Sequence, residues 1–389
     1  MRVYLDHNAG APMRPAVRDS MADFAARAAH GNPASVHRAG QAVRRELERS
    51  RAQVGEMIGA FAKSIVFTSG GTEANNLAIA GTLAANPARR RIVTTTIEHS
   101  SVRAPLSDLE SRGFEVIRVN PDYDGVVDSD ALAREVNRET ALVSVGLANA
   151  EVGTIQRITP IAEAAARAGA LLHLDAAQAA GRISLDVDAL HCDLMTISAH
   201  KIGGLAGSGA LYVRPGARML PATLGGPQEA GLRAGTPNLL GAITFGIAAE
   251  ATASALDEEA ARLVELSRHL FDRLSRAIPG LTLNGPLHGR LPNTLNLTFP
   301  GVLGETLLIA LDLEGIEVSM GSACAAGAVE PSHVLLAMGR SAAAARSSLR
   351  LSLGWSTTAA EIAIASDVIP HAWRRIVAAE PISTAEAAR

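Results

Sequence analysis

The chain has 389 residues, of which 48% are hydrophobic and 19% charged, with a formal net charge of -3 at pH 7. This composition excludes a disordered protein, and the length exceeds what a single core usually fills. Because 36 basic residues nearly balance 39 acidic ones, we expect small-molecule partners and neither nucleic acid nor membrane.

The N-terminal segment resembles no secretory leader. Residues 1–6 run into polar sequence without an apolar core, and no stretch of 18 uncharged apolar residues follows. We therefore expect a cytoplasmic protein.

Residues 64–213 alternate short β-rich runs with alanine-rich helical stretches. This alternation predicts an α/β fold with a mainly parallel sheet covered by helices. Seven strands are expected, at residues 65–68, 91–95, 115–119, 141–147, 171–175, 194–198 and 210–213.

Polar side chains follow several of these strands at the point where each strand ends. Because ligands of an open α/β sheet bind at the carboxyl ends of its strands, we expect these side chains to converge on one crevice. The groups concerned are Ser69 to Thr72, Glu98 with His99, Asn149, Asp175 with Gln178, and Ser198 to Lys201.

The chain beyond the sheet changes character twice. Residues 225–238 are rich in glycine and lack periodicity, which favours a functional or interfacial loop. A helical stretch then runs from 241 to 278, where Pro279-Gly280 ends it. An α+β unit follows, with strands expected at 294–299 and 348–353 and helices at 304–314 and 331–338. We therefore expect a large domain of residues 15–255 and a smaller α+β domain of residues 1–14 and 256–389.

Ser69-Gly70-Gly71-Thr72 lies between a strand and a helix. Free backbone N–H groups, the helix dipole and the Thr72 hydroxyl favour an anion such as a phosphate there. An ordinary capped turn is the alternative interpretation. Neither the P-loop fingerprint nor a G-x-G-x-x-G motif opening a helix after a strand occurs.

The chain has two lysines, Lys63 and Lys201. Lys63 precedes a strand in an expected exposed loop, as most lysines do. Lys201 leaves a buried strand for a glycine-rich turn at the predicted crevice. An amine desolvated there can lose its proton and form a Schiff base with an aldehyde cofactor.

Asp175 and His99 extend this interpretation. Pyridoxal phosphate needs a carboxylate beside its ring nitrogen, and Asp175 ends a neighbouring strand. Taken alone, Asp175 is equally well a cap or turn residue. His99 can stack on a flat ring and exchange protons, or it can be a hydrogen-bonded structural residue. The joint occurrence with Lys201 favours the cofactor.

The two cysteines differ in context. Cys324 lies among small residues in the segment 321–327, where it can be an accessible nucleophile or, as the local sequence alone slightly favours, an inert small residue. Cys192 leads into a strand, so we expect it to be buried and structural. Two thiols are too few for a structural zinc site, and we expect no metal.

These segments together resemble the cysteine desulfurases of the NifS and IscS type, in the fold-type-I, class-V aminotransferase group of pyridoxal-phosphate enzymes. The resemblance runs nearly end to end. The matching segments are residues 3–9, 31–37, 67–76, 97–102, 174–178, 198–201, 321–324, 330–332 and 349–354.

The resemblance implies that Lys201 holds the cofactor, Asp175 meets its pyridine nitrogen, Gln178 its phenolic oxygen, and His99 stacks on the ring. Four groups would bind its phosphate, namely the Gly71 backbone, Thr72, Ser198 and His200. Thr236 would reach the phosphate of a neighbouring subunit, which makes the enzyme a homodimer.

The implied reaction starts from L-cysteine, whose carboxylate Asn149 and Arg350 would orient. Lys201 removes the Cα proton, and the Cys324 thiolate attacks the substrate sulfur. L-Alanine leaves and a persulfide remains on Cys324, from which the sulfur passes to an acceptor protein such as an iron–sulfur scaffold.

Three other functions remain open at this point. A selenocysteine lyase or another class-V aminotransferase would share the fold, although transamination has no use for the Cys324 thiol. A catalytically silent homologue could serve iron–sulfur assembly, but Lys201, Asp175 and His99 are intact. A nicotinamide oxidoreductase would need the phosphate fingerprint that the chain lacks.

Overall fold

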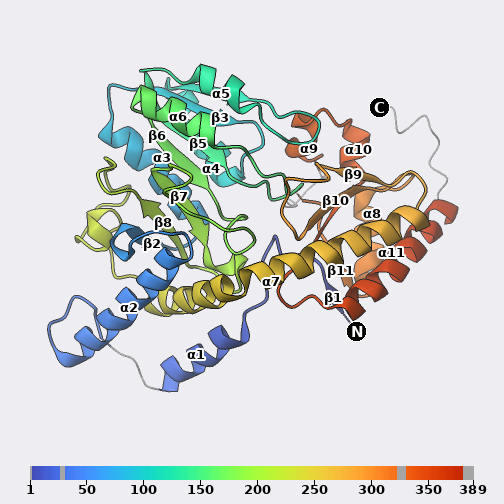
Figure 1. The fold of residues 1–389 in the computed structure, drawn as a ribbon, viewed down its shortest axis with the longest axis horizontal. Coiled ribbons are helices and arrows are strands. Elements are labelled where there is room, and N and C mark those ends of the chain that lie inside the picture. Colours follow the sequence, from blue (N-terminus) through green and yellow to red (C-terminus); the bar gives the residue numbers. More distant parts are fainter. Residues whose placement is uncertain (1, 27–30, 322–329, 380–389) are drawn as a thin grey trace.

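The computed structural model describes residues 2–26, 31–321 and 330–379 (Figure 1). Its largest sheet has seven strands in the order β2-β8-β7-β6-β5-β3-β4. Only β8 runs antiparallel to its neighbours, so the predicted mainly parallel sheet is confirmed. The strands are β2 Ile65–Thr68, β3 Arg91–Thr95, β4 Glu115–Val119, β5 Thr140–Gly146, β6 Leu171–Asp175, β7 Leu194–Ser198 and β8 Gly209–Val213.

Alternate residues of these strands face opposite sides of the sheet, and each side has its own core. On β2, Ile65 and Phe67 belong to one hydrophobic cluster and Val66 to another. On β5, Val143 faces the first cluster and Leu142 the second. The period of two along each strand places apolar side chains on both faces, which explains the buried runs in the sequence.

Helices cover both faces (Figure 1). The helices of this part of the chain are α1 Pro15–Ala26, α2 Arg38–Glu56, α3 Gly71–Ala85, α4 Ser100–Ser111, α5 Ser129–Glu135, α6 Thr159–Ala168 and α7 Leu239–Ala277, with the short 3-10 turns η1 Ala62–Ser64, η2 Ala199–Lys201 and η3 Glu229–Gly231. Helix α1 lies apart from the sheet and packs against α7.

Helix α7 has 39 residues and joins the two cores. Phe245 in its first half packs in the core of the large sheet, whereas Leu270 and Leu274 pack in a separate cluster. A helix of this length spans roughly 60 Å. Among the described residues, α7 is the one helix long and apolar enough to cross a membrane, but half of its most apolar window is buried inside the protein. This degree of burial is typical of a helix in a protein core.

The second hydrophobic core is formed mostly by residues of the C-terminal part of the chain. A three-stranded sheet in the order β12-β10-β9 packs there, and β1 pairs in parallel with β11. We infer that this core belongs to a smaller domain of residues 1–14 and 256–389, and the first to a domain of residues 15–255. The remaining elements are β1 Val3–Tyr4, β9 Thr282–Asn284, β10 Thr294–Thr298, α8 Gly304–Leu313, β11 Ile316–Glu317, α9 His333–Ala337, α10 Ala342–Arg346, β12 Ser348–Ser352 and α11 Ala359–Ala379.

Helices α2 and α7 approach closely at Gly246. A Cβ atom at this position would lie 2.6 Å from the Cα of Ser50 and 2.5 Å from the side-chain oxygen of Gln53. We expect Gly246→Ala to lower the free energy of unfolding by about 1–3 kcal/mol, because overpacking outweighs the higher helix propensity of alanine. Urea denaturation measures this change.

The matched control is Glu258→Ala at an exposed position of the same helix, which we expect to change stability by less than about 0.5 kcal/mol. A Gly246→Ala protein as stable as the parent would show that α2 and α7 do not need this close contact.

Candidate active site

The carboxyl ends of three parallel strands meet at one edge of the large sheet. In the strand register Asp175 at the end of β6 lies between Gly146 of β5 and Thr196 of β7. Lys201 follows three residues after β7 ends at Ser198. Asp175 and Lys201 therefore lie at the same edge of the sheet.

Lys201 is enclosed by main-chain carbonyls of the N-terminal segment. Its Nζ donates to the oxygen of Asn8 at 2.6 Å and to that of Ala9 at 2.9 Å. No carboxylate of the described residues forms an ion pair with it. Burial, followed by the positive charges of Arg182 and Arg350, lowers the pKa of Lys201 to about 8. The amine is therefore partly neutral near physiological pH.

Asp175 and Gln178 lie beside this amine. One oxygen of Asp175 accepts from the Ala177 N–H at 3.0 Å, and the other accepts from the Asn75 amide at 2.8 Å. The Gln178 amide nitrogen donates to the Asn8 oxygen at 3.0 Å, the same carbonyl that Lys201 contacts. The side-chain oxygen of Gln178 is buried without a hydrogen-bond partner within the described residues. Such an atom marks a place where a ligand donor would fit.

The start of α3 adjoins the end of β7. A Cβ atom on Gly71 would lie 3.7 Å from that of Ser198, whose hydroxyl is 2.9 Å from His200 Nδ1. Gly70, which caps α3, has a φ of 151°, a backbone conformation that favours glycine. Thr72 in the first turn is exposed. The first-turn N–H groups and these hydroxyls form a suitable phosphate site.

His99 caps the N-terminus of α4. Its Nδ1 accepts from the Ser101 N–H at 3.1 Å and lies 2.7 Å from the Ser101 hydroxyl. The ring is exposed in the single chain, yet its desolvation and the nearby Lys201 charge lower the pKa of His99, against the opposing effect of Asp175. The ring is therefore neutral at physiological pH. Burial also raises the pKa of the adjacent Glu98 to about 7.

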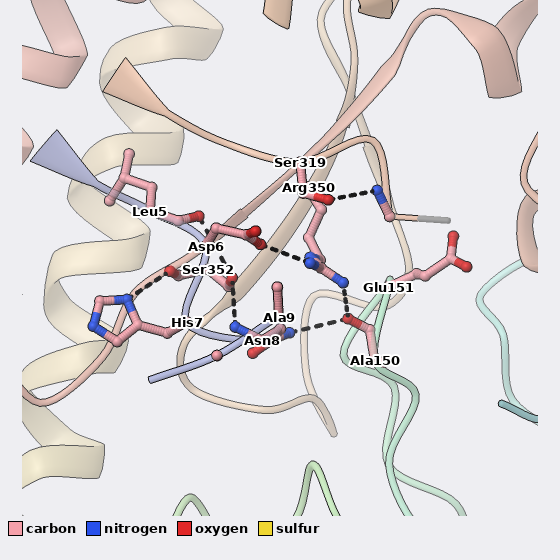
Figure 2. A network of polar contacts seen from close by, with 12 residues as sticks. Leu5, Asp6, His7, Asn8, Ala9, Ala150, Glu151, Ser319, Arg350 and Ser352 are labelled. Atoms are coloured by element: carbon pink, nitrogen blue, oxygen red, sulfur yellow. Dashed lines mark hydrogen bonds and ion pairs between the residues drawn. The ribbon is translucent and has the colours of Figure 1, made fainter. Parts of the chain in front are cut away.

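Arg350 lies on β12, in a network with the N-terminal segment (Figure 2). Its guanidinium donates to Asp6 at 2.6 Å and to the Ala150 oxygen at 3.3 Å, and the Asn8 amide donates to the same Ala150 oxygen at 3.0 Å. Its backbone pairs with Ser319. The Arg350 Nε is buried without an acceptor among the described residues. One donor of the held guanidinium thus remains for an anion.

The Asn149 side chain shapes the turn after β5. Its oxygen accepts from the N–H groups of Glu151 and Val152 at 2.9 and 3.1 Å, and its nitrogen donates to the Ile97 oxygen at 3.1 Å. Its predicted contact with a substrate would therefore use its remaining amide hydrogen.

The loop that carries Thr236 is tied to α3 and to β2. Arg233 pairs with Glu73 of α3 at 2.9 Å. The Glu229 carboxylate pairs with buried Arg51 at 2.6 Å and accepts from a backbone N–H of β2. Thr236 itself is exposed. This placement leaves its side chain available to another molecule.

The structure describes one of the two cysteines. Cys324 lies outside the described residues. Cys192 is buried, as expected, and burial raises the pKa of its thiol to about 12. A thiol of this kind is inert at neutral pH.

Several residues at the site were not assigned a role from the sequence. Asn8 and Asn75 occupy matched segments, but their contacts depend on long-range packing. Among the described residues, the buried Arg182 donates to the carbonyls of Gln178 and His7 alone. The full set is Asp6, Asn8, Asn75, Ser101 and Arg182.

The chain matches a family and several characterised proteins. The family model described as aminotransferase class-V matches residues 3–364. The chain is 41% identical to the cysteine desulfurase IscS of Dictyoglomus turgidum, over 94% of this chain and 93% of that one. It is 42% identical to a cysteine desulfurase of Cereibacter sphaeroides over 99% of both.

Solved structures agree in fold. A NifS-like protein superposes with a TM-score of 0.89 at 34% identity, covering 95% of this chain and 99% of the other. A structure described as SspA in complex with cysteine superposes with a TM-score of 0.80 at 31% identity, covering 90% and 99%. The predicted fold is confirmed.

The pKa of Lys201 is directly measurable, because Lys63→Arg leaves Lys201 as the chain's one lysine. We expect the ε-amine of the cofactor-free protein, labelled by reductive ¹³C-methylation and followed by NMR, to titrate with a midpoint near the lowered value of about 8. Lys201→Arg identifies the signal by its loss. A midpoint above about 10, the ordinary range for lysine, would contradict the described environment.

Proposed function

The chain belongs to the class-V aminotransferase family, and we propose that it is a pyridoxal-phosphate-dependent cysteine desulfurase that converts L-cysteine to L-alanine. The observation that carries this proposal is the half-buried Lys201 amine, whose pKa is lowered, beside Asp175 and Gln178. Relatives named cysteine desulfurase, 39–42% identical over nearly the whole chain, support it.

The residues present fit pyridoxal phosphate. Asp175 offers a carboxylate for the ring nitrogen, and the unpartnered oxygen of Gln178 and its amide lie beside Lys201. The start of α3, with Ser198 and His200, would hold the phosphate. When bound, pyridoxal phosphate supplies electron withdrawal from the substrate Cα.

Lys201 acts as the base in this proposal. Its carbonyl neighbours hold the amine in place, and the pKa of about 8 allows a neutral amine to take the Cα proton of L-cysteine. Arg350, which Asp6 holds in place, and Asn149 orient the substrate carboxylate. His99, neutral because its pKa is lowered, lies against the reacting group and exchanges protons with it.

Cys324 receives the sulfur. Its thiolate attacks the substrate sulfur, a new S–S bond forms, the Cβ–S bond of the substrate breaks, and the Cβ takes a proton to become the methyl group of L-alanine. In sum, L-cysteine and the Cys324 thiol give L-alanine and a Cys324 persulfide. No external oxidant is required, because the sulfur is transferred between the two.

The site also suggests its partners. Thr72, His99 and Thr236 are exposed in the single chain, although this chemistry requires exclusion of water. We infer that a second copy covers them, with Thr236 reaching the partner's phosphate site in a homodimer. The persulfide would pass to an acceptor protein, such as an iron–sulfur scaffold, in the cytoplasm.

The cysteine substitutions test this assignment. Cys324→Ala should lower alanine production from L-cysteine on the order of a thousandfold while the holoenzyme still binds pyridoxal phosphate, because the sulfur acceptor is lost. Coupled assays of alanine and sulfide measure this effect.

Cys192→Ala is the matched control, and it should retain activity within about twofold because Cys192 only fills the core. Normal alanine production by Cys324→Ala would overturn the role of Cys324. A large loss in folded Cys192→Ala would mean that the two thiols had been assigned the wrong way round.

A further inference from the structure

A series of hydrogen bonds connects Asp175 to His99 through Asn75 and Ser101. The Asn75 amide nitrogen donates to Asp175 Oδ2 at 2.8 Å and to the Ser101 hydroxyl at 2.8 Å. The Ser101 hydroxyl lies 2.7 Å from His99 Nδ1. These four residues come from β6, α3 and the start of α4, so the packing of two helices on the sheet creates the connection.

The direction of each bond follows from chemistry. An ionised carboxylate only accepts, so the Asn75 nitrogen faces Asp175, and its second hydrogen points to the Ser101 oxygen. Ser101 therefore accepts from Asn75, and its own hydrogen is free for His99 Nδ1. The Ser101 backbone N–H also points at Nδ1, at 3.1 Å. Two donors at Nδ1 leave the hydrogen of a neutral ring on Nε2.

Burial strengthens this directionality. Asn75 and Ser101 are 1% and 7% exposed. Water therefore does not readily compete for their hydrogen bonds. The Asn75 oxygen is buried without a hydrogen-bond partner in the described part of the chain. Turning the amide over would place that oxygen against the Asp175 carboxylate. The amide therefore keeps its orientation although one of its polar atoms is unsatisfied.

We propose that Asn75 and Ser101 are positioning residues that transmit the orienting effect of the Asp175 carboxylate to His99 and hold its ring in the Nε2–H tautomer. The proposal deepens the proposed function and rests on it, since it concerns how His99 meets the reacting group. His99 then presents a hydrogen-bond donor to that group. The charged or titratable groups that face His99 are Asp175, Lys201 and His333.

NMR of the ¹⁵N-histidine-labelled protein tests the proposal. In the cofactor-free and loaded parent, the His99 ring, assigned by loss of its signals in His99→Gln, should show a bare Nδ1 and a protonated Nε2. In Ser101→Ala, we expect a mixture of tautomers and a fall in kcat for L-cysteine on the order of tenfold, with KM changed less, since a misoriented catalytic group lowers the rate of chemistry.

Ser100→Ala, at the adjacent exposed position, is the matched control and should leave the tautomer and kcat unchanged. Ser101→Thr keeps the hydroxyl and should restore the parent tautomer. Asn75→Ala keeps Ser101 but removes the link to Asp175, so it should also give a mixture, and it serves if Ser101→Ala does not fold.

A protonated Nδ1 in the parent, or an unchanged tautomer in both folded Ser101→Ala and Asn75→Ala, would overturn the proposal. The NMR result does not depend on turnover, because it is read in the cofactor-free protein. A parent that shows the Nε2–H tautomer but forms no alanine from L-cysteine would contradict the proposed function and leave the tautomer assignment standing.

Discussion

The site depends on one half-buried lysine amine that has no carboxylate ion-pair partner among the described residues. Lys201 contacts the carbonyls of Asn8 and Ala9, and two arginines raise the local positive potential. Because burial and like charge both disfavour an ammonium ion, the amine is more easily neutral than an ordinary lysine. Arg182 contributes to this effect, and its hydrogen bonds within the described residues go to carbonyls. A fraction of the Lys201 amine is therefore neutral near physiological pH.

The N-terminal segment makes this arrangement possible. It begins as β1 beside β11 of the second core, and it then passes between Arg350 and the Lys201 turn. Asp6 fixes the guanidinium of Arg350 (Figure 2), and Asn8 offers its carbonyl to Lys201 and Gln178. One short piece of chain therefore contacts Lys201, Gln178 and Arg350, the residues proposed as base, cofactor ligand and carboxylate ligand.

The sheet could be predicted because buried apolar runs are a local pattern, whereas the roles of the site residues came mostly from the family resemblance and stay predictions. Buried apolar runs located the seven strands, with β5 and β8 starting one residue earlier than expected. The contacts of Asn75, Ser101 and Asn8 depend on packing between distant segments, as do the short strands β1 and β11, which no local pattern predicts. Thr236 and Cys324 are furthest from a structural account, since the role of Thr236 needs a second subunit and Cys324 lies outside the described residues.

The most direct test of the central claim is the reaction of the purified holoenzyme with L-cysteine, followed by alanine analysis and mass spectrometry of the peptide that carries Cys324. The account predicts L-alanine as the product and a mass increase of about 32 Da on Cys324, the mass of one sulfur atom added to the thiol. Bound pyridoxal phosphate without alanine and without this increase would contradict it.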